Sequence, residues 1–304
     1  PLGTELIEFV LKPAPCRRRS WFNNRSYLDT LSEEAVGKFI EVTHEKYRQE
    51  IGEHFGKTVP GIFTDEPNHG GMFRNVWAVD GCLPWTAGLP RCFQEMFGYD
   101  VIARLPELAY DPVDGGRPYS QVRYHYCRCK ARMFAQAFAK TIGEWCNDNN
   151  LFLTGHVQEE RPISNNISMC GSTMQFYSHM QLPGIDIVRR FRMEFLIPKQ
   201  CASVARQMGC KWVLSEMYGA TGWPTTFETY KHNGDWQTVL GITMRCPHVS
   251  WYSMAGEAKR DYPASIHFQS PWWRQYRHLE TYFSRLHVVL GAGDPVCDLA
   301  VIHP

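Results

Sequence analysis

The sequence predicts an α/β fold of the (β/α)8 TIM-barrel type. Short apolar runs alternate with amphipathic helical stretches, and the clearest run shows no polar alternation, as expected of a parallel strand covered on both faces. The loops after these runs are long, polar and aromatic, and a barrel carries its active site at the carboxyl ends of its strands. A doubly wound sheet is the alternative, but no Gly-rich phosphate loop follows any run.

The elements follow in order along the chain. Thr30 and Glu33 have the spacing of a capping box, which predicts a helix that ends at Gly56. The run TVPGIFT at 58–64 is then a strand, and apolar spacing predicts a long helix over 121–148. The remaining predicted strands are 151–157, 184–188, 211–216 and 248–254, and the remaining predicted helices are 92–97, 198–209 and 234–244.

These strands are fewer than the eight of a barrel. Residues 1–277 are therefore predicted to form a catalytic barrel that lacks its first units. Residues 278–304 read as a linking helix, a Gly-rich turn and the first strand of a further domain.

Composition narrows the class of protein. The 304 residues are 44% hydrophobic and 21% charged, with a net charge of +1, which does not indicate nucleic-acid binding. No apolar run is long enough to span a membrane, and we see no signal peptide. Eleven scattered cysteines are expected to be reduced, buried thiols, which slightly favours the cytoplasm. Compartment and oligomeric state stay open.

Carboxylates end three of the predicted strands, in GIFTDEP, LTGHVQEE and VLSEMYG. Because parallel strands of one barrel share a direction, these ends would converge on one pocket. Glycoside hydrolysis needs such a pair: a protonated acid for the leaving oxygen, and an ionised partner as nucleophile or as base for water.

Glu66 is the first choice for the general acid. Strand alternation directs Asp65 and Glu66 oppositely, and the longer Glu before Pro67 reaches further. Asp65 would hold a neighbour or a metal; a solvated turn is the alternative for both. Glu216, after an apolar strand, is a candidate partner, with a buried salt bridge as its structural alternative.

The stretch after the strand 151–157 offers a third group. His156, Glu159 and Glu160 could ligate a metal or bind sugar hydroxyls. The absence of HExxH disfavours zinc, calcium through carboxylate oxygens is more plausible, and the sequence requires no cofactor and identifies no metal ligands. Aromatic residues crowd between 212 and 273, and flat rings pack on sugars. The candidate substrate-binding residues, each with a structural alternative, are Asp65, His156, Glu159, Asp186, Tyr218, Trp223, Asp235 and Trp251.

The chain resembles bacterial glycoside hydrolases of the α-L-rhamnosidase-like group, family 106 and its relatives, within the barrel glycosidases that include the β-galactosidases. The matching stretches cover most of residues 27–304 and include YLDTLSEEAVGKFIEVTHEKY, GKTVPGIFTDEP, LPWTAGLPRCFQEMFGYD, LTGHVQEE, LPGIDIV, LSEMYGATGW and the segment from YSMAGEAKRDYP to LETYFSRL.

This resemblance implies a barrel domain in a longer multidomain enzyme that removes terminal sugars from glycans. In related barrel glycosidases the acid follows the fourth strand and its partner the seventh, which implies Glu66 and Glu216. In the rhamnosidases proper, hydrolysis is inverting and calcium helps to hold the sugar, and the base would come instead from Glu160 or Glu159. Asp65 departs from the Asn that many such barrels carry before the acid.

The predicted function is therefore a glycoside hydrolase that removes a terminal, α-L-rhamnose-like sugar. The alternatives are a retaining β-galactosidase-like hydrolase with Glu216 as nucleophile, a non-catalytic glycan-binding barrel, and a metal-dependent hydrolase that uses His156. Glu66 is expected to face Glu216 or Glu160 at about 5–5.5 Å in a retaining enzyme and about 6.5–9.5 Å in an inverting one.

Overall fold

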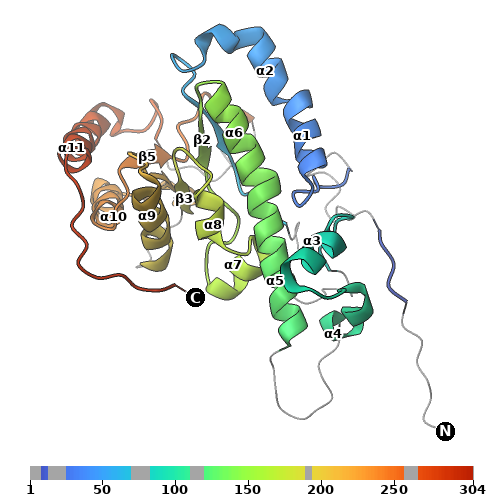
Figure 1. The fold of residues 1–304 in the computed structure, drawn as a ribbon. Helices are drawn as coiled ribbons and strands as arrows, with labels where there is room; N and C mark the ends of the chain where they lie inside the picture. The colour runs from blue at the N-terminus through green and yellow to red at the C-terminus, as the bar shows by residue number, and fades with distance from the viewer. Residues whose placement is uncertain are drawn as a thin grey trace. The chain divides into compact units, whose positions relative to one another are not determined.

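The structure is a computed structural model that describes residues 8–12, 25–69, 83–109, 120–188, 194–256 and 266–303 (Figure 1). The chain divides into two compact units, residues 1–181 and 182–304. Each unit contains helices and parallel strands, which confirms the predicted α/β class. The described residues contain five strands, so the eight-stranded barrel stays a prediction.

The first unit contains a two-stranded parallel sheet. Strands β1 (Gly61–Thr64) and β2 (Phe152–Gly155) pair in register from Gly61 opposite Phe152 to Thr64 opposite Gly155. Both strands lie where the sequence predicts them. The expectation that β1 is covered on both faces is wrong, because Phe63 is 40% exposed.

The helices of this unit confirm one long prediction and correct another. The predicted helix 121–148 is continuous through α5, η3 and α6, and η3 is a π-helical stretch (Figure 1). The predicted helix that starts at the capping box instead breaks at Thr43 into two helices, α1 and α2. Ser32 caps α1 by accepting from the Ala35 N–H, and the Thr30 hydroxyl donates instead to the Asn68 carbonyl at 2.7 Å.

The remaining bounds in the first unit are as follows. The helices and short helical turns are α1 Glu33–Val42, α2 His44–Ile51, η1 Gly52–His54, α3 Leu89–Phe97, η2 Ile102–Arg104, α4 Leu105–Ala109, α5 Gln121–Phe134, η3 Ala135–Lys140, α6 Thr141–Asp148, α7 Ile163–Met169 and α8 Thr173–Tyr177. An apolar cluster built on Phe93, Leu108 and Tyr126 packs α3 and α4 against α5.

The second unit contains a three-stranded parallel sheet in the order β3-β4-β5. The strands are β3 (Gly184–Ile187), β4 (Leu214–Met217) and β5 (Met244–Pro247), and the helices are α9 (Leu196–Met208), α10 (Phe227–Val239) and α11 (Trp273–Gly291). The predicted strand at 248–254 is wrong, because α10 ends at Val239 and β5 begins at Met244. Ser250 forms only an isolated bridge with Ile266.

Residues 294–303 form neither helix nor strand. The strand expected there is not present in the structure, and a domain that follows α11 stays a prediction. None of the described helices is long and apolar enough to cross a membrane.

Gly155 allows the two strands of the first unit to pair closely. Its φ is +114°, and a Cβ at this position would lie 1.9 Å from the Thr64 carbonyl oxygen. We expect Gly155→Ala to lower the free energy of unfolding by at least ~2 kcal/mol, measured by urea unfolding, because backbone strain and a steric clash add.

Gly98→Ala is the matched control. Gly98 also has positive φ, at +78°, but a Cβ there meets no atom within 4 Å. The control should lose only about 1 kcal/mol. Equal losses in the two variants would contradict the role given to the close approach.

Candidate active site

The first group of candidate residues extends one face of the β1–β2 sheet. Leu153 packs toward Gly143 of α6, so the side chains that alternate with it, Phe63 and Thr154, lie on the opposite face. His156 continues this face, since its N–H still bonds to the Thr64 carbonyl at 3.1 Å.

His156 connects the ends of the two strands. Its ring centroid lies 5.7 Å from that of Phe63, and its Nε2 atom lies 3.2 Å from Oδ1 of Asp65. The His156 side chain is 1% exposed and that of Asp65 is 74% exposed. A buried imidazole therefore orients a solvent-facing carboxylate beside the predicted acid.

Glu66 leaves the extended conformation of the strand. Its φ is +49°, in the left-handed region, and the side chain is exposed. The alternation argument that opposed Asp65 to Glu66 therefore does not hold, because that argument requires extended backbone at both positions. Left-handed backbone at a non-glycine residue costs free energy and is concentrated at functional sites.

Asn68 holds the backbone behind Glu66. Its Nδ2 donates to the Glu66 carbonyl at 3.2 Å and to Oε1 of Gln158 at 2.6 Å. Its own N–H donates to the Tyr27 hydroxyl at 3.4 Å. The loop after β1 is thus bonded to the loop after β2, and Glu66 is held in its left-handed conformation.

Three of the predicted carboxylates act electrostatically on one buried thiol. The Cys170 Sγ donates to the Gln158 carbonyl at 3.0 Å. Burial raises the pKa of Cys170 well above its usual range, and the negative charges of Glu160, Glu66 and Glu159 raise it further. These three glutamates therefore lie within electrostatic range of the same sulfur atom.

Glu159 and Glu160 are held by different partners. Glu159 also has a left-handed backbone, with φ of +55°, and its Oε2 accepts from Nδ2 of Asn165 at 3.2 Å. Glu160 is 5% exposed and accepts a short hydrogen bond from the Tyr177 hydroxyl. Neither Tyr177 nor Cys170 is at a spacing that sequence reasoning connects to these acids.

The second group lies on the β3–β4–β5 sheet. Arg245 of β5 points to α11, where it bonds to Glu280 at 2.6 Å and lies 3.9 Å over the Phe283 ring. Side chains alternate along the strands, so Asp186 and Glu216, which are register partners, lie on the face away from α11.

Glu216 has a histidine neighbour on this side. Nε2 of His248 lies 3.8 Å from Oε1 of Glu216, and Glu216 is 8% exposed. Because β4 is flanked by strands on both sides, its backbone is fixed, and Glu216 is held more rigidly than a loop residue would be.

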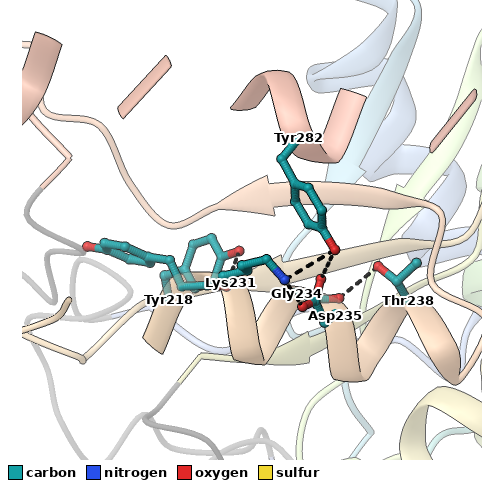
Figure 2. Close-up of polar contacts among 7 residues, drawn as sticks. Tyr218, Lys231, Gly234, Asp235, Thr238 and Tyr282 are labelled. Carbon is teal, nitrogen blue, oxygen red and sulfur yellow. Dashed lines mark hydrogen bonds and ion pairs between the residues drawn. The ribbon is translucent and has the colours of Figure 1, made fainter. Parts of the chain in front are cut away.

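Tyr218 and Asp235 lie instead in the packing around α10 and α11. Tyr218 has φ of +72°, and its buried hydroxyl donates to the Tyr230 carbonyl at 3.2 Å and accepts from Arg245. Burial raises the pKa of Tyr218. Asp235 accepts from Lys231 at 2.5 Å and from the Tyr282 hydroxyl at 2.7 Å, as Figure 2 shows. Substrate contact by these two residues stays a prediction that none of these contacts supports.

The two predicted tryptophans lie together. The ring centroids of Trp223 and Trp251 are 5.1 Å apart; Trp223 is 49% exposed and Trp251 8%. The structure thus collects the candidates into a first-unit group, Asp65, Glu66, His156, Glu159 and Glu160, and a second-unit group, Asp186, Glu216, Trp223 and Trp251.

Known proteins provide an independent comparison. The chain is 24% identical over 285 residues to a Formosa agariphila protein provisionally named a beta-glucuronidase, with 90% of this chain and 22% of that protein covered. Its fold is similar to that of a rhamnosidase from Novosphingobium sp. PP1Y, with a TM-score of 0.65, 20% identity, and coverage of 88% of this chain and 25% of that one. The chain spans about a quarter of the length of these relatives.

The sequence profile of glycoside hydrolase family 106, described as alpha-L-rhamnosidase, matches residues 24–303. The match covers nearly the whole chain and includes every candidate residue named above. It confirms the family resemblance that the strand-end motifs predict. The chain therefore belongs to the alpha-L-rhamnosidase family of glycoside hydrolases.

Proposed function

We propose that this chain is part of the catalytic domain of a glycoside hydrolase that removes a terminal, α-L-rhamnose-like sugar. The observation that carries the proposal is that Asp65 and Glu66 follow β1 while Glu159 and Glu160 follow β2, two parallel strands that pair in register. Carboxylates at the carboxyl ends of neighbouring parallel strands are the catalytic groups that glycoside hydrolysis requires.

The proposal extends to the architecture. Parallel strands in both units, and the fold likeness to a rhamnosidase, support a (β/α)8 barrel. Because the matched relatives are about four times as long as this chain, we place this barrel in a multidomain bacterial enzyme.

In the proposed mechanism Glu66 is the general acid. Its protonated carboxyl donates a proton to the glycosidic oxygen as the bond from that oxygen to the anomeric carbon breaks. The hydrogen bond from Asn68 to the Glu66 carbonyl fixes the backbone, while the side chain stays exposed to meet the leaving group. The Asp65–His156 pair beside it is available to accept and orient sugar hydroxyls.

Two glutamates are candidates for the partner carboxylate. Glu160 belongs to the same unit as Glu66 and shares its electrostatic surroundings, but one of its oxygens already accepts from Tyr177. Glu216 lies on a central strand beside His248. As base, the partner would take a proton from water as that water attacks the anomeric carbon; as nucleophile, it would attack the carbon itself.

Calcium is part of the proposal. Ca²⁺ takes carboxylate and carbonyl oxygens, and Glu159 and Glu160 are consecutive carboxylates in the loop after β2. Where Glu216 is the partner carboxylate, these residues would hold the ion, which when bound supplies a fixed positive charge for sugar hydroxyls. The remaining ligand positions are left to the substrate and water.

A second sugar is favoured by one comparison. The Formosa agariphila relative carries the name of a beta-glucuronidase, so a uronic acid is the alternative terminal residue. Rates on 4-nitrophenyl α-L-rhamnoside and 4-nitrophenyl β-D-glucuronide, measured side by side with the full-length protein, decide between the two sugars.

The acid role of Glu66 predicts a substrate-dependent loss. In Glu66→Gln we expect kcat/KM on a disaccharide with a poor leaving group to fall by roughly 10²–10⁴-fold. The loss on an aryl glycoside with an activated leaving group should be below about tenfold, because that leaving group needs little protonation. The control is Glu34→Gln, an exposed glutamate on α1. Equal losses on both substrates would exclude Glu66 as the acid.

The partner carboxylate can be identified by chemical rescue. We expect one of Glu160→Ala and Glu216→Ala to lose roughly 10²–10⁴-fold in kcat and to recover with added azide, because the small anion replaces the missing carboxylate. Proton NMR of the first product anomer from the unmodified enzyme then separates retention from inversion. Loss without azide rescue in both variants would leave neither glutamate as the partner.

The calcium proposal predicts a stability change. Ca²⁺ at about 100 times its Kd should stabilise the folded protein by roughly 2.7 kcal/mol, seen as a higher midpoint of thermal unfolding after dialysis against a chelator. Glu159→Gln should reduce this shift, and Glu34→Gln should not. A midpoint insensitive to Ca²⁺ in the unmodified protein would remove the ion from the proposal.

A further inference from the structure

A row of aromatic rings lies beyond the carboxyl ends of β4 and β5 in the second unit. Trp223 follows β4, and its ring centroid is 5.1 Å from that of Trp251, which follows β5. The Trp251 ring lies 5.7 Å from His267, whose ring lies 4.2 Å from Phe268. Segments that are far apart in the sequence therefore contribute to one row.

The row keeps several flat surfaces in solvent. Trp223 is 49% exposed, Phe268 65%, and Tyr252, next to Trp251, is fully exposed. Single exposed apolar residues are ordinary, but several large rings at one end of a sheet indicate a binding surface. The row follows the second-unit candidates along the chain: His248, three residues before Trp251, lies 3.8 Å from Glu216.

Two buried donors accompany the rings. Nδ1 of His267 accepts from the Gln269 N–H at 3.2 Å, so the proton of this ring is on Nε2. His267 Nε2 and the indole Nε1 of Trp251 are both buried, and neither has a hydrogen-bond partner in the described part of the chain. Because an unmet buried donor is unfavourable, this pair indicates a ligand that brings acceptor oxygens.

We propose that Trp223, Trp251, His267 and Phe268 bind the ring on the leaving-group side of the scissile bond. This inference rests on the proposed function. Exposure gives the side: Trp223 is 49% and Phe268 65% exposed, whereas Glu216 is 8% exposed, so these two rings lie nearer to solvent than the carboxylate does, where the leaving group departs. The required ligand has a flat apolar face, which both a pyranose and an aromatic aglycone offer, but only the pyranose adds several hydroxyl oxygens for the two donors.

The kinetic test varies the leaving group at a constant terminal sugar. We compare kcat/KM of the full-length protein on methyl, 4-nitrophenyl and glucosyl α-L-rhamnosides for Trp223→Leu and Trp223→Phe. Trp223→Leu should lose about tenfold on the ring-bearing substrates, the size of one stacking contact, and less than about twofold on the methyl glycoside. Trp223→Phe, which keeps a flat ring, should recover most of the loss.

The three substrates separate the possible ligands. Loss on the glucosyl substrate alone assigns the row to a pyranose, and loss on the aryl substrate as well assigns it to any flat ring. His267→Ala should reduce only the glucosyl rate, because an aryl ring offers its donor no hydroxyl. An equal loss on all three substrates, the methyl glycoside included, would overturn the proposal.

A binding measurement keeps this test independent of catalysis. Phenyl β-D-glucopyranoside, which carries a pyranose and an aryl ring but no rhamnose, should quench tryptophan fluorescence saturably in the unmodified protein. Phe268→Leu should weaken this binding at least about threefold, and Tyr47→Leu, at an exposed tyrosine of α2, should not. Saturable quenching without any rhamnosidase activity would contradict the proposed function but support the aromatic binding site. The absence of quenching would contradict the binding site itself.

Discussion

Parallel pairing of short strands is the constraint on which the candidate site depends. Because β1 runs alongside β2 in register, the loops that leave them start at the same edge of the sheet. Gly155 makes this possible, since any side chain there would collide with the Thr64 carbonyl. The same geometry in the second unit places Asp186 beside Glu216.

Left-handed backbone then directs the side chains after the strands. Glu66, Glu159 and Tyr218, all non-glycine, take positive φ within a few residues of a strand end. Such conformations persist only where surrounding bonds enforce them. Asn68 does so behind Glu66, and Asn165 bonds to the Glu159 carboxylate. Ordinary hydrogen bonds thus stabilise backbone conformations that direct these carboxylates differently from the way an extended strand would.

Local patterns predicted the elements well and the loop geometry poorly. Apolar runs located β1 to β4 and the long helix 121–148. These elements could be predicted because burial and helical periodicity depend on residues that are near one another in the sequence. They misplaced the fifth strand, whose residues MRCP carry no strand signal and pair only because β4 lies beside them. The hydrogen bonds of Cys170 and Tyr177 join residues whose spacing in the sequence matches no regular pattern, so the sequence did not predict these bonds. Substrate contact by Asp235 stays a prediction, since sequence alone does not show that its carboxylate accepts from Lys231 one helical turn earlier.

The protonated thiol of Cys170 has a consequence for charge balance. The sulfhydryl stays neutral here, because burial and the negative charges of Glu160, Glu66 and Glu159 all raise its pKa. It therefore fills buried space without adding a fourth negative charge, while it donates to the Gln158 carbonyl. Cys170 is thus a neutral hydrogen-bond donor at a position where three carboxylates would repel a further anion.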